Sequence, residues 1–183
     1  GTVLVLGDGQ SALDAAAKLA DRMDVTVVLG GAREAIAPRV MDVPIFRGQV
    51  TGATGYLGAF EVNISNSAPA SPSHRSGLDF YGGGQSGVIE CDLIFDLRGT
   101  NPLFGAPEKR DGYFNPNPGN PTAVAENLLT MIDMVGEFDK PRYVDYDPEI
   151  CAHARNEITG CTKCLDACPT GAITPDGDKA AYD

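Results

Sequence analysis

The stretch "TVLVLGDGQSALDAA", residues 2–16, decides the fold of most of this chain. Residues 2–6 are a continuous apolar run of the kind that forms strands buried on both faces. The run ends at "GDGQS", where Ser11 is the predicted N-cap of a helix over "ALDAAAKLADRM". A second apolar run, "VTVVL", follows at residues 25–29. The two runs and their short connection predict a right-handed β-α-β unit with parallel strands.

The middle of the chain has a different pattern. In "AFEVNIS", residues 59–65, apolar and polar side chains alternate as they do in a half-exposed antiparallel strand. With "PIFRGQV" before it (44–50) and "LDFY" after it (78–81), it predicts a three-stranded meander. The apolar run "CDLIFDL", residues 91–97, is expected to rejoin the parallel sheet. The predicted fold is therefore α/β, a Rossmann-like parallel sheet with an antiparallel β-meander insertion.

The last part of the chain is predicted to form a second, smaller domain. Residues 98–120 are rich in Pro, Gly and Asn and indicate an irregular excursion. Pro121 suits the first position of a helix over "PTAVAENLLTMIDMVGEF", whose apolar residues recur at helical spacing. We place a boundary near Lys140, between a Rossmann-like domain at 1–140 and a cysteine-rich segment at 141–183.

Four of the five cysteines lie in that segment, spaced Cys151-x9-Cys161-x2-Cys164-x3-Cys168-Pro169. Thiolates two and three residues apart can curl around one cuboidal iron–sulfur cluster. Zinc bound by four thiolates is the alternative, but zinc ribbons favour two CxxC pairs. His153 is interpreted as a plain loop histidine, although it could also hydrogen-bond near a cluster or bind zinc. The fifth cysteine, Cys91, is expected to be a buried core residue.

The cysteine segment resembles bacterial-type 4Fe-4S ferredoxins over residues 147–183. The last two intervals, Pro169 and the following "TGAI" carry the resemblance. It implies that Cys151, Cys161 and Cys164 ligate one cluster, while Cys168 either completes it or belongs to a neighbouring cluster. It also implies a short hairpin over "ITPDGDKAAYD", followed by a second cysteine run. We expect the segment to be cut before that run and its cluster to be incomplete, because ligation and folding are coupled.

The turn "GDGQSA" matches G-x-G-x-x-A at Gly7, Gly9 and Ala12, between a strand and a helix. This context predicts a dinucleotide site for FAD or NAD, with the pyrophosphate at the helix N-terminus. Two features weaken the pattern. The acid expected after the second strand is replaced by glycines, and Asp8 places a negative charge inside the turn. A β-α turn without a ligand is the alternative.

The layout as a whole resembles part of the flavin-binding domain of heterodisulfide reductase and related multidomain iron–sulfur proteins. "VLVLGDGQSALDAA", "GYLGAFEVNI" and "CDLIFDLRGTNPLF" carry this resemblance. It implies a domain in which flavin passes electrons among clusters. Asp96, in the last of these stretches, forms no recognisable acid–base pair with a nearby residue.

The predicted function is electron transfer by a cluster-binding module of a larger redox protein. The alternatives are an FAD- or NAD(P)-dependent oxidoreductase with attached clusters, and a non-catalytic Rossmann-like scaffold. Redox proteins or further domains of the same polypeptide are the expected partners. A formal charge of −11 argues against nucleic acid and against an anionic membrane surface. Clustered cysteines and the lack of an apolar run near 20 residues favour a cytoplasmic protein.

Overall fold

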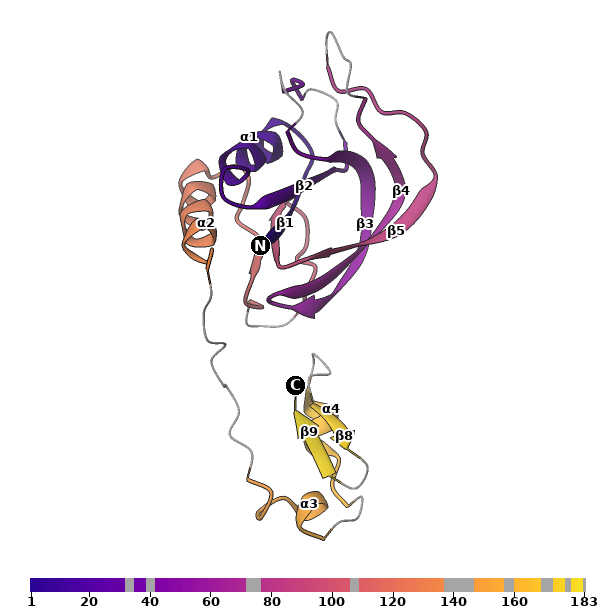
Figure 1. Ribbon diagram of the computed structural model, residues 1–183, viewed down its shortest axis with the longest axis vertical. Coiled ribbons are helices and arrows are strands. Elements are labelled where there is room, and N and C mark those ends of the chain that lie inside the picture. The colour runs from indigo at the N-terminus through magenta and orange to yellow at the C-terminus, as the bar shows by residue number, and fades with distance from the viewer. Residues whose placement is uncertain are drawn as a thin grey trace. The chain divides into compact units, whose positions relative to one another are not determined.

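The chain folds into two compact units in a computed structural model of the protein (Figure 1). The structure describes residues 1–31, 35–38, 42–71, 77–105, 109–136, 147–156, 160–168, 173–176 and 179–182. The first unit is Gly1–Gly136 and the second is Glu137–Asp183. The predicted boundary near Lys140 lies outside the described residues.

The predicted β-α-β unit is present at the start of the chain (Figure 1). Strand β1 (Thr2–Gly7) leads into helix α1 (Gln10–Leu19), and β2 (Asp24–Leu29) returns parallel to β1. Residues 3–7 of β1 are all buried. This burial is the reason for the continuous apolar run, because a strand inside a covered parallel sheet exposes neither face to water.

A mixed seven-stranded sheet forms the centre of the first unit, in the order β5-β4-β3-β2-β1-β6-β7. Strands β3, β2, β1, β6 and β7 pair in parallel, whereas the pairs β3–β4 and β4–β5 are antiparallel. The apolar run at 91–97 does rejoin the parallel sheet, as β6 beside β1. The further strands are β3 (Ile45–Tyr56), β4 (Ala59–Pro69), β5 (Gln85–Cys91), β6 (Leu93–Leu97) and β7 (Tyr113–Phe114).

The antiparallel meander is present, but its third strand was predicted in the wrong place. That strand is β5, whereas Phe80 of the predicted stretch 78–81 makes only an isolated bridge to Ala70. β5 is an edge strand whose first four residues are exposed, so no alternation of apolar and polar residues marks it. In β4 the predicted alternation is confirmed, with Phe60, Val62 and Ile64 buried.

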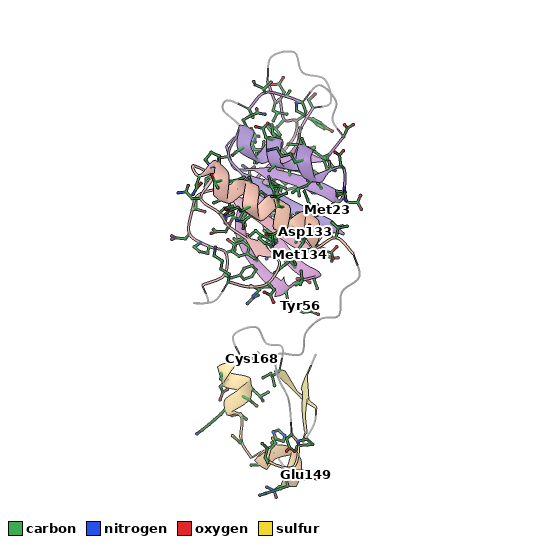
Figure 2. The ribbon with its side chains drawn as sticks, turned by 90° about the vertical axis from the view of Figure 1, so that its left-hand side faces the viewer. Met23, Tyr56, Asp133, Met134, Glu149 and Cys168 are labelled. Atoms are coloured by element: carbon green, nitrogen blue, oxygen red, sulfur yellow. The ribbon has the colours of Figure 1, made fainter. Side chains whose placement is uncertain are left out.

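The parallel strands are covered on both faces. Helices α1 and α2 (Pro121–Asp133) lie side by side over one face (Figure 2), where Val3 and Val5 of β1 pack. Leu4 and Leu6 belong to a second cluster on the opposite face, together with the apolar side chains of β4. The antiparallel half of the sheet thus curls around and covers the face opposite the helices (Figure 1).

Helix α2 begins at Pro121, as predicted, and Asn120 caps it. The Asn120 side chain accepts a hydrogen bond from the Ala123 N–H at 3.2 Å. Leu128 and Met131 are buried against the core. The helix ends at Asp133 rather than reaching residue 138 as predicted.

The second unit contains short elements in its described residues. These are α3 (Ala152–Asn156), α4 (Lys163–Ala167), β8 (Ile173–Asp176) and β9 (Lys179–Tyr182). β8 and β9 pair as an antiparallel hairpin, which the sequence predicted there. α3 packs near β9, and α4 near β8. Across the described parts of both units, no helix has the length and apolar character that crossing a bilayer requires.

Candidate functional site

The glycine turn after β1 joins the strand to α1 by a close approach. A Cβ atom on Gly7 would lie 2.7 Å from the Cβ of Ala12, closer than real side-chain carbons approach. Two of the predicted residues, Gly7 and Ala12, therefore meet, and both are small because the helix packs directly on the strand end. Gly9 differs, since among the described residues nothing lies within 4 Å of where its Cβ would be. The backbone of Gly9 is open to approach.

Helix α1 begins earlier than the sequence predicted. Its N-cap is Gly9 in an extended conformation, so the prediction of Ser11 as the cap is wrong. Asp8 and Gly9 alone complete the turn, which places Ser11 inside the first helical turn. Gln10 donates from its Nε2 to an Asp14 carboxylate oxygen, and its own Oε1 accepts from the Ile36 N–H, both at 2.8 Å. The cap residue thus supplies no side-chain acceptor to the first N–H groups of the helix.

We expect Gly7→Ala to destabilise the first unit and Gly9→Ala to leave its stability almost unchanged. The added methyl at Gly7 collides with Ala12, an overpacking that costs about 1–3 kcal/mol. At Gly9 the same methyl enters open space on an extended backbone, so the change stays within about 0.5 kcal/mol. Urea unfolding followed by circular dichroism measures both. Equal losses in the two variants would contradict this account of the turn.

A buried hydrogen-bond network lies at the carboxyl end of β6. Asp96 is 1% exposed, and its two oxygens accept from Nε and Nη2 of Arg98 at 2.8 and 2.7 Å. The Tyr113 hydroxyl donates to Asp96 at 2.8 Å and accepts from the Leu103 N–H at 3.0 Å. No acid–base pair was predicted for Asp96, and the structure instead gives it an ion pair with Arg98 and a hydrogen bond from Tyr113. Its partners lie two and 17 residues further along the chain, and a strand pattern gives no indication of them.

The network lies beside the glycine turn, because Gly7 of β1 pairs with Leu97 of β6. The hydrogen bonds that Arg98 donates to Asp96 raise the pKa of the Arg98 guanidinium, and the negative charge of Asp8 raises that pKa further. Burial raises the pKa of Tyr113 to about 12, so its hydroxyl stays protonated and continues to donate. The carboxylate of Asp96 thus engages Nε and Nη2 of Arg98 in a bidentate ion pair, which fixes the guanidinium at the end of β6.

The four clustered cysteines flank the two helices of the second unit. Cys151 directly precedes α3, Cys161 precedes α4, Cys164 lies within α4, and Cys168 is its C-cap. Cys161 and Cys164 are exposed, whereas Cys151 and Cys168 are half-buried. Cys168 lies at the α4 end of the unit, away from α3 (Figure 2). Over the described residues, no three His, Cys, Asp or Glu side chains lie close enough together to hold a metal ion.

The chemistry of this donor set fits an iron–sulfur cluster, although no three of its thiols lie together within the described residues. Four cysteines within one short segment supply the ligand type and number that a cubane needs. Cys164 lies inside α4, whereas Cys168 follows the helix in an extended conformation. Pro169 and residues 170–172 of the motif lie outside the described residues. Binding would require a rearrangement that brings the thiols together around one centre.

The interior of the second unit contains a histidine. Among residues 147–156, 160–168 and 173, whose side chains are described, only His153 is buried. The large apolar side chain of Ile150 is 81% exposed. His153 lies in α3 at 2% exposure, so its interpretation as a plain loop residue is wrong. Its Nε2 atom is buried and has no hydrogen-bond partner among the described residues.

Cys91 is a core residue, as predicted. It ends β5 at 5% exposure and belongs to the cluster opposite the helices. Burial, with a smaller contribution from the negative charge of Asp92, raises the pKa of its thiol to about 12. Its thiol therefore stays protonated at neutral pH, which makes it a poor nucleophile and a poor metal ligand.

We expect alkylation of the metal-free protein near neutral pH to modify the exposed Cys161 and Cys164 while sparing Cys91.

The burial of Cys91 also predicts a loss of stability at alkaline pH. The unfolded chain ionises Cys91 near pH 9 while the folded chain keeps it protonated, so stability falls as the pH rises from 9 to about 12. Peptide mass spectrometry measures the labelling, and urea unfolding against pH measures the decline. A decline just as steep in Cys91→Ala would argue against this assignment.

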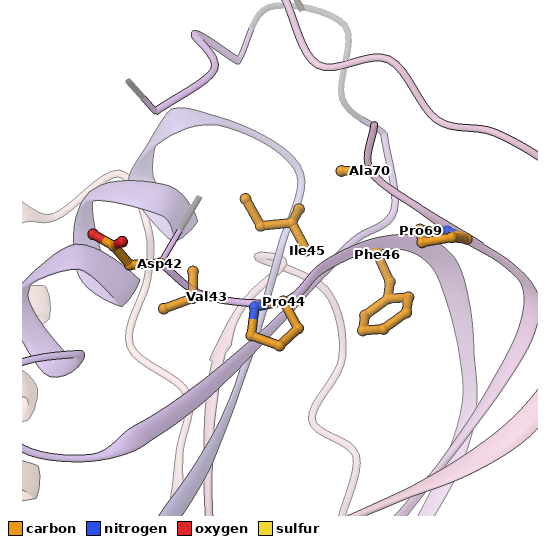
Figure 3. A pocket seen from close by; sticks show the side chains of 7 residues that line it. All are labelled: Asp42, Val43, Pro44, Ile45, Phe46, Pro69 and Ala70. Carbon is orange, nitrogen blue, oxygen red and sulfur yellow. The ribbon is translucent and has the colours of Figure 1, made fainter. Parts of the chain in front are cut away.

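An open pocket of about 400 Å³ lies at the beginning of β3 and the end of β4 (Figure 3). It is lined by residues 42–46 together with Pro69 and Ala70. Asp42 is its one charged residue, and none of the predicted site residues belongs to it. The pocket therefore adds nothing to either predicted site.

No protein-family model matches this chain, and no curated protein matches it either, so these comparisons assign it to no family.

Proposed function

We propose that the second unit binds a 4Fe-4S cluster through its clustered cysteines and that the chain is an electron-transfer module of a larger redox protein. Cys151, Cys161 and Cys164 would hold one cluster. Cys168 would either complete that cluster or serve a neighbouring one. When bound, such a cluster takes up and releases single electrons. The chain supplies the thiolates, and hydrogen bonds to sulfur set the reduction potential.

The observation that carries this proposal is the interior of the second unit. Among the side chains described in this unit, only His153 is buried and the large apolar Ile150 is exposed, so these described side chains form no apolar core of their own. Units of this size usually need a disulfide or a metal site, because apolar burial alone does not offset the entropy lost on folding. A cluster bound by four thiolates would act as the core, and its binding would draw the thiols together.

Zinc is the competing occupant for four thiolates. Structural zinc sites commonly use paired CxxC motifs, whose two thiolates are separated by two residues. Here three residues separate Cys164 from Cys168, and Pro169 follows, which is the arrangement of ferredoxin-type clusters. The resemblance to ferredoxins therefore favours iron over zinc.

Anaerobic reconstitution of the full chain tests the proposal. The metal-free protein is incubated with ferrous iron, sulfide and a thiol reductant, desalted, and analysed for bound iron and sulfide. We expect iron and sulfide in equal amounts and an EPR signal after reduction with dithionite. A folded chain that binds zinc stoichiometrically and takes up no iron would contradict it.

The first unit is proposed to act as the platform of this module, in contact with redox partners or with further domains. Its β-α-β unit and the resemblance to the flavin-binding domain of heterodisulfide reductase support this role. The excess of acidic over basic residues gives the chain its formal charge of −11. Such a charge would attract a redox partner with a basic docking surface.

Binding of FAD or NAD at the glycine turn is a second candidate function. The open backbone at Gly9 and the uncapped start of α1 favour it. The carboxylate of Asp8 and the engagement of Arg98 by Asp96 act against it, because a pyrophosphate is negatively charged. Titration with FAD or NADH, followed by fluorescence and thermal unfolding, tests this function. Saturable binding that is lost in Gly9→Val would support it, and no binding would favour a scaffold role.

A further inference from the structure

Two exposed thiols share one turn of the backbone at the start of α4. Cys161 and Cys164 are three residues apart, and both side chains are exposed. Thr162, between them, has φ −113° and ψ 7°, and Lys163 already belongs to α4, so the chain turns here instead of extending. Residues three apart on a helical turn face the same side. The thiols of Cys161 and Cys164 therefore leave the same side of the turn.

The backbone between these two cysteines has the shape that a disulfide needs. Thr162 and Asp166 hold the turn, because the Asp166 N–H donates to the Thr162 carbonyl at 3.0 Å and the Thr162 hydroxyl donates to the Asp166 carboxylate at 3.2 Å. A tight turn brings the Cα atoms of its first and fourth residues within about 7 Å of each other. Disulfides join residues whose Cα atoms are about 4.4–6.8 Å apart. A bond between Cys161 and Cys164 is therefore compatible with an intact α4.

The other three cysteines are less suited to react with an oxidant in solution. Cys168 is half-buried and follows α4 with φ −80° and ψ 104°, which is extended backbone. Cys151 is also half-buried and lies ten positions before Cys161. Cys91 is buried in the first unit. The exposed pair, Cys161 and Cys164, is thus the pair of thiols that a dissolved oxidant reaches first.

We propose that Cys161 and Cys164 form a reversible disulfide in the metal-free chain, with a small-molecule disulfide such as oxidised glutathione as the oxidant. One cysteine thiolate attacks the small disulfide and releases the first glutathione thiol. The second cysteine thiolate attacks the resulting mixed disulfide, forms the bond within the chain and releases the second glutathione. The chain loses two electrons and two protons, and the small disulfide gains both as it becomes two thiols.

This disulfide controls cluster assembly, a role that rests on the proposed cluster binding. Iron in such clusters is held by thiolates, and Cys161 and Cys164 are two of the proposed ligands. The sulfurs of a disulfide carry no negative charge and are no longer thiolates. The oxidised chain therefore lacks two ligands and takes up no cluster until a reductant restores them.

Peptide mapping tests the pairing. The full metal-free chain is incubated with oxidised glutathione, its remaining thiols are alkylated, and it is digested with trypsin. Trypsin cleaves after Lys163, between the two cysteines, so their bond joins the peptide 156–163 to the peptide 164–179. We expect this linked pair, and we expect dithiothreitol to separate it. A bond between Cys164 and Cys168 would stay within the second peptide and would contradict the proposal.

Two variants make the map decisive. Cys168→Ser should still give the linked pair, because Cys168 takes no part in the bond; loss of the linkage would assign the bond to Cys168 and overturn the proposal. Cys161→Ser should instead keep glutathione on Cys164 as a mixed disulfide, since no second thiol stands on the same turn to displace it. Circular dichroism of each variant checks that the fold is retained.

Iron uptake tests the control of assembly separately. The oxidised and the reduced chain are each given ferrous iron and sulfide anaerobically, without a thiol reductant. Because sulfide can itself reduce disulfides, the bond is mapped at each time point. We expect the reduced chain to take up iron at once, and the oxidised chain only as the linked pair disappears. Cys91→Ala should behave as the wild type in both states.

The outcomes separate this inference from the function on which it rests. A reduced wild-type chain that takes up no iron overturns the proposed function and the control of assembly, whereas the peptide map alone decides the pairing. Iron uptake by a chain whose disulfide is intact overturns the control of assembly and leaves cluster binding in place. A wild-type chain that carries only mixed disulfides with glutathione overturns the pairing.

Discussion

Cys161→Ser and Cys164→Ser are each expected to abolish uptake of iron and sulfide by the reconstituted chain. Both thiols are exposed, so the substitutions remove no packing from the folded apo protein. Serine has nearly the same size, but its hydroxyl is a far weaker ligand for iron than a thiolate. Iron and sulfide analysis with visible absorbance measures the effect. Circular dichroism should show little change in the metal-free protein.

Cys91→Ala is the matched control for these two variants. It removes a thiol that is buried in the first unit, and it should leave iron uptake at the wild-type level. Wild-type uptake in both serine variants, or a loss in Cys91→Ala alone, would contradict the ligand assignment. Cys168→Ser separates the two arrangements left open for that residue. Loss of the cluster identifies it as the fourth ligand, and retention places it at a neighbouring cluster.

Asp96→Ala is expected to lower the free energy of unfolding of the first unit by about 3 kcal/mol. Removing one partner of a buried ion pair costs about 3–5 kcal/mol, because it leaves the other charge without compensation. We expect the lower end of that range, since the Arg98 side chain is 16% exposed and can regain water. The Tyr113 hydroxyl also loses its acceptor. Urea unfolding of the full chain, followed by circular dichroism, measures the loss.

Asp14→Ala is the control for this effect. Asp14 is an exposed acid that accepts a hydrogen bond from the Gln10 side chain, so its loss should change stability by less than about 0.5 kcal/mol. Combining Asp96→Ala with Tyr113→Phe should give less than the sum of the two single effects, because the residues share one network. A loss below about 1 kcal/mol in Asp96→Ala would show that the network adds little stability.

The strands that were predicted correctly are those whose own residue pattern reflects their burial. The apolar runs of β1, β2 and β6 reflect burial on both faces, and the alternation in β4 reflects burial on one. Strand β5 could not be found in this way. It lies at the edge of the sheet, its exposed side chains follow no alternation, and its pairing with β4 is set by tertiary context. The aromatic stretch at 78–81 looked more like a strand, yet it forms only a bridge.

The candidate sites were predictable to different degrees. Spacing alone singled out the four cysteines, and the strand–helix context singled out Gly7, Gly9 and Ala12. Spacing does not report where thiols lie in space, so it could not show that no three of them come together within the described residues. The network around Asp96 was missed because its tyrosine lies 17 residues away. One signal was available: a carboxylate inside an otherwise apolar strand, with an arginine two residues on, implies a buried ion pair.

The position of β1 inside the sheet has a consequence for synthesis. One edge of β1 pairs with the nearby β2, but its other edge pairs with β6, and Val3 lies opposite Leu93. A ribosome adds about 5–20 residues per second, so Leu93, 90 positions after Val3, follows it by roughly 5–20 s. Through that interval the second edge of a fully apolar strand has no native partner. The earliest strand in the sequence is thus among the last to be enclosed, and nascent chains would be open to edge-to-edge association.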